Sequence, residues 1–268
     1  MQKPPFQKKG GHGAHCRSTA HPQAHAYNEA MSAPRLHLLI PAAGVGARAE
    51  TAQPKQYQAL AGQAMVLHTL LALSRVSGID GLHVVVSPGD THMAQLLSTQ
   101  PALYSVRVWP VGGDTRAASV AGGLAALANG GAQDHDWVLV HDTARCLIQP
   151  AWVERLIEAC RDDEVGGILA LPLADTLKQA DADARVRCTL SRDDKWLAQT
   201  PQMFRLGLLQ RALRQTGVGV TDEASAIEAL GLKPTLVPGN ALNLKVTYPE
   251  DLMLAETLLS ARIMEKHT

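Results

Sequence analysis

The sequence predicts an α/β fold: a Rossmann-like, mostly parallel sheet with helices on both faces and a β-arm that projects from it. From Leu36 onward, short apolar or β-branched runs alternate with amphipathic stretches, which is the pattern of strands joined by helices. The runs around Val85 and Leu139 are almost wholly apolar, as expected of strands that are buried on both faces. Hydrophobic residues make up 46% of the 268 residues and aromatic residues only 4%, which suits helices packed on a parallel sheet.

The individual elements follow from these runs in chain order. The first apolar run, Leu36–Pro41, leads into a Gly-rich loop. The amphipathic stretch Ala64–Val76 is the first predicted helix, and the strand Leu82–Ser87 follows it. Gly112-Gly113-Asp114 separates a strand from a helix, for which Asp114 is a suitable cap. The predicted strands are Leu36–Pro41, Leu82–Ser87, Val106–Pro110, Trp137–His141, Gly167–Pro172, Thr235–Pro238 and Leu244–Thr247. The predicted helices are Ala64–Val76, Thr91–Leu97, Thr115–Ala128, Ala151–Arg161, Leu206–Gln215, Asp222–Ala229 and Pro249–Ile263.

Residues 173–198 interrupt the alternation of strands and helices. They are polar, charged and only weakly β-like, with a turn region rich in Asp and Ala between Lys178 and Arg187. We expect them to form a hairpin arm that projects from the main sheet; the alternative is a long solvated loop. The segment has too little apolar surface to form a core of its own.

Residues 1–34 differ from the rest of the chain. They hold four of the eleven histidines, four cationic residues against a single acidic one, and no apolar periodicity. Such a segment buries too little apolar surface to offset the entropy of ordering, so we expect a disordered tail ahead of a folded domain at 35–268. Its histidines are compatible with metal binding, although a solvated tail is the simpler interpretation. Met31 is an alternative first residue.

The composition excludes several classes of function. The formal net charge is zero, whereas a general nucleic-acid binder carries a basic excess. The chain lacks a run of apolar residues long enough to span a membrane, so we expect no membrane association. Cys16, Cys146, Cys160 and Cys188 are irregularly spaced and none belongs to a C-x-x-C pair, which indicates free thiols in a reducing cytoplasm.

The loop after the first predicted strand has the features of a phosphate-binding site. It runs Pro41-Ala42-Ala43-Gly44-Val45-Gly46-Ala47-Arg48, and small residues at a strand-to-helix turn let backbone N–H groups approach an anion. A nicotinamide enzyme would need an acidic residue about 20 positions further on, yet no Asp or Glu occurs from Thr51 to Ile79. The loop is followed instead by Lys55, and with Arg48 this places two cations near a triphosphate.

A carboxylate follows the buried strand that begins at Trp137. Asp142 lies at the carboxyl end of that strand, where α/β sheets bind ligands, and Mg²⁺ commonly bridges one carboxylate and substrate phosphates. We therefore assign Asp142 to the metal and nucleotide side of the site. The alternative role for Asp142 is a simple turn or helix cap. We expect His141, which comes just before it, to be structural.

The string from Ile40 to Tyr57, with P-A-A-G-x-G-x-R followed by P-K-Q-Y, resembles the 2-C-methyl-D-erythritol 4-phosphate cytidylyltransferase family of the non-mevalonate isoprenoid pathway. The resemblance covers residues 36–262 and rests on a series of further motifs. They are Gly112-Gly113-Asp114-x-Arg116-x-x-Ser119, His141-Asp142-x-Ala144-Arg145, Asp175-Thr176-Leu177-Lys178, Thr200-Pro201-Gln202, Thr221-Asp222-Glu223-Ala224-Ser225 and Asn243-Leu244-Lys245-Val246-Thr247.

The resemblance implies an enzyme that transfers CMP from CTP to 2-C-methyl-D-erythritol 4-phosphate and releases pyrophosphate. It implies that Arg48 and Lys55 are catalytic, through stabilisation of the transition state, and that Mg²⁺ bound near Asp142 is the cofactor. The residues it implies for CTP are Pro41, Ala42, Ala43, Gly44, Gly46, Gly113, Asp114, Ser119, Asp142 and Thr143. Those it implies for the acceptor are Arg192, Lys245, Thr176, Arg145 and Thr221. It further implies a homodimer in which each arm reaches the other subunit's site.

Three positions depart from the family pattern, and two other functions stay open. Thr143 and Cys146 replace Ala and Pro of the usual His-Asp-Ala-Ala-Arg-Pro motif, and Leu242 stands where Asp is common. Ribitol 5-phosphate cytidylyltransferase, with the same fold and chemistry, is the nearest alternative. A nucleotide-binding module without catalysis is the other, and the presence of Arg48 and Lys55 argues against it.

Overall fold

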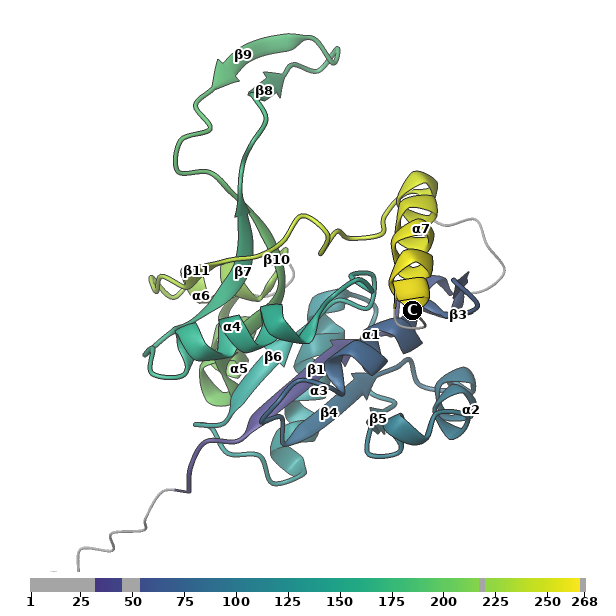
Figure 1. The fold of residues 1–268 in the computed structure, drawn as a ribbon. Helices are drawn as coiled ribbons and strands as arrows, with labels where there is room; N and C mark the ends of the chain where they lie inside the picture. The colour runs from purple at the N-terminus through teal and green to yellow at the C-terminus, as the bar shows by residue number, and fades with distance from the viewer. Residues whose placement is uncertain (1–31, 45–53, 217–219, 266–268) are drawn as a thin grey trace, which may run out of the picture. The chain divides into compact units, whose positions relative to one another are not determined.

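A mostly parallel sheet organises the protein, for which the computed structural model describes residues 32–44, 54–216 and 220–265. Within these residues the sheet has seven strands in the order β11-β7-β10-β6-β1-β4-β5 (Figure 1). Only β10 is antiparallel to its neighbours β6 and β7. The strands are β1 (Leu36–Pro41), β4 (Gly81–Val85), β5 (Arg107–Trp109), β6 (Trp137–Val140), β7 (Gly166–Pro172), β10 (Trp196–Arg205) and β11 (Thr235–Pro238).

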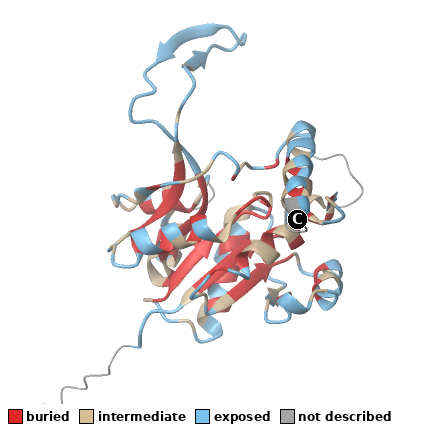
Figure 2. Cartoon of the chain, in the orientation of Figure 1, coloured by how far each residue is buried: buried red, intermediate tan, exposed pale blue. Residues whose placement is uncertain are grey.

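Helices cover both faces of this sheet, as predicted. Leu38 and Ile40 of β1 pack in one core cluster and Leu39 packs in another, because successive side chains of a strand point to opposite faces. The first cluster includes residues of α1 (Met65–Leu73), α2 (His92–Ser98) and α4 (Pro150–Cys160). The second includes residues of α3 (Arg116–Asn129), α5 (Leu206–Thr216) and α6 (Glu223–Glu228). Figure 2 shows the buried strands between helices whose outer faces are exposed.

A third, smaller apolar cluster fastens the last helix to the loops near the carboxyl ends of the strands. Ala255 and Leu259 of α7 (Pro249–Glu265) pack with Leu60, Cys146 and Val246. Leu60 belongs to a short hairpin of β2 (Ala59–Leu60) and β3 (Gln63–Ala64), which the sequence analysis missed. None of the helices in the described ranges is both long and apolar enough to cross a membrane.

Residues 173–198 form the projecting arm that the sequence predicts. β8 (Leu177–Ala180) and β9 (Val186–Leu190) pair as an antiparallel hairpin beyond the ends of β7 and β10 (Figure 1). The hairpin is solvent-exposed, and Val186 and Leu190 are 65% and 42% exposed. The hairpin interpretation is therefore confirmed, and the alternative of an unstructured loop is wrong.

One strand assignment from the sequence is wrong, and one strand of the main sheet was missed. Leu244–Thr247 is an extended loop and not a strand, because its backbone bonds to other loops: Val246 N–H donates to Ala144 O at 2.8 Å. β10 was missed because its first residues look like part of the arm and Thr200-Pro201 interrupts the run. The structure accommodates that dipeptide with a cis peptide bond and a register shift between Ala198 and Gln202. For the tail, residues 1–31 lie outside the described residues.

Candidate active site

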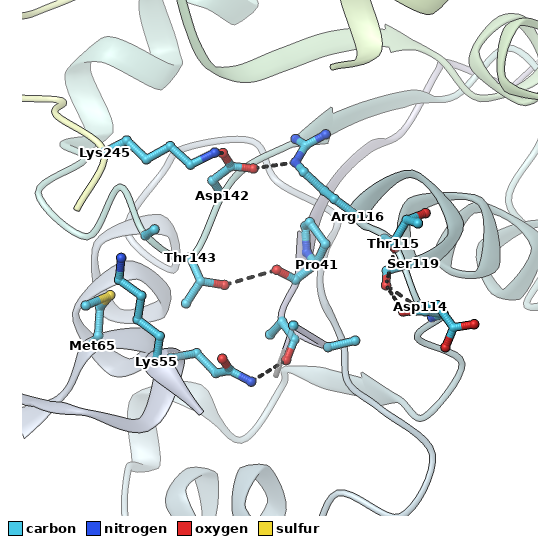
Figure 3. A pocket seen from close by; sticks show the side chains of 16 residues that line it. Pro41, Lys55, Met65, Asp114, Thr115, Arg116, Ser119, Asp142, Thr143 and Lys245 are labelled. Carbon is cyan, nitrogen blue, oxygen red and sulfur yellow. Dashed lines mark hydrogen bonds and ion pairs between the residues drawn. The ribbon is translucent and has the colours of Figure 1, made fainter. Parts of the chain in front are cut away.

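The main candidate site is a cavity of about 260 Å³ at the carboxyl ends of β1 and β6 (Figure 3). Parallel strands bring the loops that follow them to this edge, which is where α/β sheets bind ligands. The cavity is lined by Pro41, Ala42, Ala43, Gly44, Lys55, Gln56, Met65, Gly113, Asp114, Thr115, Arg116, Ser119, Asp142, Thr143, Ala144 and Lys245.

Closely packed backbone forms one wall of this cavity. A Cβ atom added at Gly112 would lie 2.2 Å from the Ala43 Cβ and 2.8 Å from the Val86 carbonyl oxygen, so only glycine fits there. Gly113 N–H donates to Ser119 Oγ at 3.1 Å, while Thr115 caps α3 by accepting from Ala118 N–H. The expected cap, Asp114, instead lines the cavity. On the other side, Gln56 donates to Ala42 O at 2.8 Å.

Asp142 is the centre of a charged network. Its Oδ1 accepts from Arg116 Nε at 2.7 Å, and its Oδ2 lies 2.8 Å from Lys245 Nζ (Figure 3). Arg116 also donates from its two terminal nitrogens to both oxygens of Glu223, at 2.6 and 2.9 Å. The bidentate geometry fixes the guanidinium plane, and through it the carboxylate of Asp142.

The electrostatics of this network keep Asp142 ionised. Burial alone would raise its pKa, but the charges of Arg116 and Lys245 outweigh that effect and hold the pKa well below its usual range. Burial raises the pKa of Glu223, and the same guanidinium opposes this shift. A carboxylate that stays charged at any physiological pH suits a site that handles a metal ion and phosphates.

Lys55 enters the cavity from the short η1 helix (Lys55–Tyr57). Its Nζ donates to the carbonyl oxygens of Val246 and Thr247, at 2.6 and 3.1 Å. Burial lowers its pKa, with Lys245 acting in the same direction and Asp251 against it. Carbonyl groups are neutral acceptors, so the ammonium charge is not cancelled and is available to an incoming phosphate.

A second cavity of about 200 Å³ adjoins the first, since both are lined by Arg116, Asp142 and Lys245. Arg145 and Thr221 line only the second one. The remaining lining residues are Ala198, Gln199, Thr200, Gln202 and Asp222. The shared carboxylate and cations therefore lie at the junction of two binding spaces.

Most of the predicted site residues come together here. The first cavity holds Lys55 with Pro41, Ala42, Ala43, Gly44, Gly113, Asp114, Ser119, Asp142 and Thr143, and the second holds Arg145, Thr221 and Lys245. Thr176 and Arg192 lie on the arm, where Arg192 donates to Ala174 O, and they line neither cavity. Gly46 and Arg48 fall outside the described residues.

The sequence analysis missed the importance of Arg116 and Glu223. Both occur in motifs that it quoted, but it gave neither of them a role. The sequence shows Glu223 beside the capping Asp222 and Arg116 at the start of a helix, but it shows neither their burial nor their pairing. Two of the three positions that depart from the family pattern fit the structure, and nothing in it explains the third, Leu242, which is exposed. Thr143 donates to Pro41 O at 3.2 Å, and Cys146 is buried.

A site in which backbone approaches a ligand closely, with lysine and arginine side chains around an ionised carboxylate, is suited to transferring part of a nucleotide. We therefore class the protein as a nucleotidyltransferase. Residues 36–261 match the family model described as 2-C-methyl-D-erythritol 4-phosphate cytidylyltransferase. The chain belongs to this family, which confirms the resemblance noted in the sequence.

Relatives and solved structures agree with this membership. A protein of Chromobacterium violaceum named 2-C-methyl-D-erythritol 4-phosphate cytidylyltransferase is 52% identical over 84% of this chain and 97% of its own length. A bifunctional IspD/IspF enzyme of Albidiferax ferrireducens is 57% identical over 85% of this chain, which spans only 54% of that longer relative. A crystal structure of 4-diphosphocytidyl-2C-methyl-D-erythritol synthase matches with a TM-score of 0.75 and 42% identity, over 84% of this chain and 99% of the other.

Proposed function

We propose that the protein transfers CMP from CTP to 2-C-methyl-D-erythritol 4-phosphate. A phosphate oxygen of this acceptor attacks the α-phosphorus of CTP, the bond from that phosphorus to the bridging oxygen breaks, and pyrophosphate leaves. The observation that carries the proposal is the junction of the two cavities at Asp142 and Lys245. A nucleotide in the first cavity and an acceptor in the second would place their phosphates on either side of these residues.

The residues of the first cavity are assigned to CTP. The backbone of Pro41 to Gly44 and the turn at Gly113 approach the ligand, while Asp114 and Ser119 lie beside that turn. We assign Lys55, together with Arg48, to the negative charge that develops on the phosphoryl oxygens during transfer. In the second cavity, Lys245, Arg145 and Thr221 are assigned to the acceptor.

The cofactor in this proposal is Mg²⁺. The described residues contain no group of three or more His, Cys, Asp or Glu side chains that would hold a metal ion on their own. The single ionised carboxylate of Asp142 fits an ion that is bound mainly through the triphosphate, as Mg²⁺ often is. When bound, Mg²⁺ supplies neutralisation of charge on the phosphates and on the leaving pyrophosphate.

The arm supports a homodimer. Its apolar side chains Val186, Leu190 and Leu197 are between 42% and 65% exposed, and an isolated two-stranded hairpin is marginally stable in water. Thr176 and Arg192 lie on the arm and line neither cavity of their own chain. We propose that pairing with a second copy covers the arm and brings Arg192 to the acceptor cavity of the partner subunit.

Mixing two impaired variants tests this shared site. Arg192→Ala is expected to raise the acceptor KM about tenfold or more, with little effect on CTP binding, because it removes a phosphate contact. Lys55→Ala is expected to be nearly inactive. A heterodimer of the two holds one site with both residues intact, so activity should return after subunit exchange, measured as pyrophosphate release. Exchange without recovery, or an active monomer in sedimentation, contradicts the shared site.

The amino-terminal segment is assigned no part in the reaction. Arg35 joins the chain to the rest of the domain, since its backbone N–H donates to Asp136 Oδ1 at 2.9 Å. We expect a chain that begins at Met31 to keep its kcat/KM within about twofold of the full chain and to unfold at the same temperature. A large loss of either in the truncated protein would show that the segment is needed.

We propose a cytoplasmic location, with which the free thiols of Cys146, Cys160 and Cys188 are compatible.

Acceptor choice separates the proposal from its nearest alternative. With saturating CTP and Mg²⁺, we expect kcat/KM for 2-C-methyl-D-erythritol 4-phosphate to exceed that for ribitol 5-phosphate by at least about 100-fold, because phosphate position and hydroxyl pattern both differ. Pyrophosphate release is the readout. A preference for ribitol 5-phosphate would replace the proposed acceptor while leaving the nucleotidyl transfer intact.

A further inference from the structure

A closed ring of hydrogen bonds lies behind the junction of the two cavities. His141 Nδ1 lies 3.0 Å from Thr200 Oγ1, and its Nε2 lies 3.3 Å from Arg145 O. Asn243 then joins the other two members of the ring. Its side-chain N–H donates to the backbone oxygen of Thr200 at 2.8 Å, and its backbone carbonyl oxygen accepts from the Arg145 guanidinium at 2.7 Å. His141 and Asn243 are completely buried.

The partners of His141 determine where its proton lies. Arg145 O is a carbonyl oxygen and only accepts, so Nε2 must carry the hydrogen. Thr200 Oγ1 accepts from Asp142 N–H at 3.0 Å, and in a neutral imidazole with its hydrogen on Nε2 the Nδ1 atom accepts from the Thr200 hydroxyl. The neutral imidazole with its hydrogen on Nε2 therefore satisfies both of these bonds.

The ring is connected to three of the charged residues that line the two cavities. Asp142 follows His141 directly, and its backbone N–H is held by Thr200. Arg145 is held at its carbonyl by His141 and at its guanidinium by Asn243. Lys245 follows Asn243 by two positions. The imidazole therefore ties the loop that carries Asp142 and Arg145 to β10 at one nitrogen and closes that loop at the other.

We propose that His141 is a positioning residue for nucleotidyl transfer. Its Nδ1 side sets Asp142 for the nucleotide through Thr200, and its Nε2 side sets Arg145 for the acceptor. This inference rests on the proposed function, because it assigns the two nitrogens to the two substrates. It differs from a purely structural role for His141, in which the imidazole would stabilise the fold and nothing else.

Two substitutions separate the two nitrogens. In His141→Asn, the side-chain oxygen takes the place of Nδ1 and accepts from Thr200, while the contact with Arg145 is lost. In His141→Gln, the amide nitrogen reaches the place of Nε2, while the contact with Thr200 is lost. We expect His141→Asn to raise the acceptor KM about fivefold to tenfold with CTP affinity within about twofold, and His141→Gln to do the reverse.

The readouts are the acceptor KM from pyrophosphate release and the dissociation constant of CTP with Mg²⁺ from calorimetry without acceptor. His83→Asn and His83→Gln are the matched controls. His83 is also buried and bonded at both nitrogens, to Trp109 Nε1 and His37 Nδ1, but it lies in the middle of β4 and lines neither cavity. These controls are expected to lower the unfolding temperature and to leave both constants within about twofold.

Equal changes of both constants in the two His141 variants, or no change in either, would overturn the inference. If the His141 variants do not fold, Thr200→Val must show the pattern expected for His141→Gln, and a failure to do so overturns the inference as well. The proposed function fails separately: the wild-type protein would then bind CTP without releasing pyrophosphate when the acceptor is added.

Discussion

Replacing Lys55 with alanine is expected to lower kcat/KM about 100-fold to 1000-fold, the range seen when one preorganised donor to a developing negative charge is removed. Lys55 lines the nucleotide cavity, and its ammonium donates to the neutral carbonyl groups of Val246 and Thr247. Arg48→Ala is expected to lose a comparable amount, since the family resemblance implies that both cations stabilise the transition state. Steady-state pyrophosphate release measures the loss.

The fold should tolerate the Lys55 substitution far better than the reaction does. Two hydrogen bonds to carbonyl groups are lost, and these contribute on the order of 1 kcal/mol each to the free energy of unfolding. Lys233→Ala is the matched control because Lys233 is exposed and lines neither cavity. Near-normal turnover in Lys55→Ala, or a loss that merely follows unfolding, would refute the catalytic assignment.

Removing divalent cations is the second change with a large expected effect. In excess chelator we expect pyrophosphate release to fall at least about 100-fold, because the charge on the triphosphate and on the leaving group is no longer neutralised. Mg²⁺ should restore the rate. Asp142→Asn should raise the Mg²⁺ concentration needed for half-maximal rate, since an amide replaces the ionised carboxylate.

The position of Asp142 makes this test specific. Arg116 and Lys245 contact its two oxygens in the structure, so Mg²⁺ held at Asp142 would share this carboxylate with both cations. Lys245→Met should accordingly weaken acceptor binding without abolishing the response to Mg²⁺. Full activity in chelator would refute the metal-dependent reaction, and an unchanged Mg²⁺ requirement in Asp142→Asn would move the ion away from this carboxylate.

Local patterns predicted most of the fold. Leu36–Pro41 and Thr235–Pro238 are strands at the predicted residues, and the predicted helices all exist with ends shifted by a few positions. These elements carry a strong apolar period of their own. β10 lacks such a period. It begins within the exposed arm, is antiparallel to its neighbours and contains Thr200-Pro201, so its sequence does not look like that of the other strands. Leu244–Thr247 has the composition of a strand, but its partners are loops, which composition does not reveal.

The site residues likewise fall into those that the sequence predicts and those that only the folded structure reveals. The glycine-rich loop, Lys55 and Asp142 were found because phosphate chemistry demands such residues next to a strand end. The pair of Arg116 and Glu223 is separated by 107 positions, and its importance comes from burial and geometry that only the folded chain shows. The same holds for the ring through His141, which joins β6, β10 and the loop before α7. The roles of Thr176 and Arg192 depend on a second subunit and stay predictions.

The central claim is that the α-phosphoryl group of CTP moves with its nucleoside to the phosphate of the acceptor. Two parallel reactions test it, one with CTP labelled at the α-phosphate and one with CTP labelled at the γ-phosphate, each with 2-C-methyl-D-erythritol 4-phosphate and Mg²⁺. The α-label should appear in a diphosphate-bridged product and the γ-label in pyrophosphate, in equal amounts. A γ-label in the acceptor product, or an α-label released as CMP without the acceptor becoming linked to it, would contradict nucleotidyl transfer.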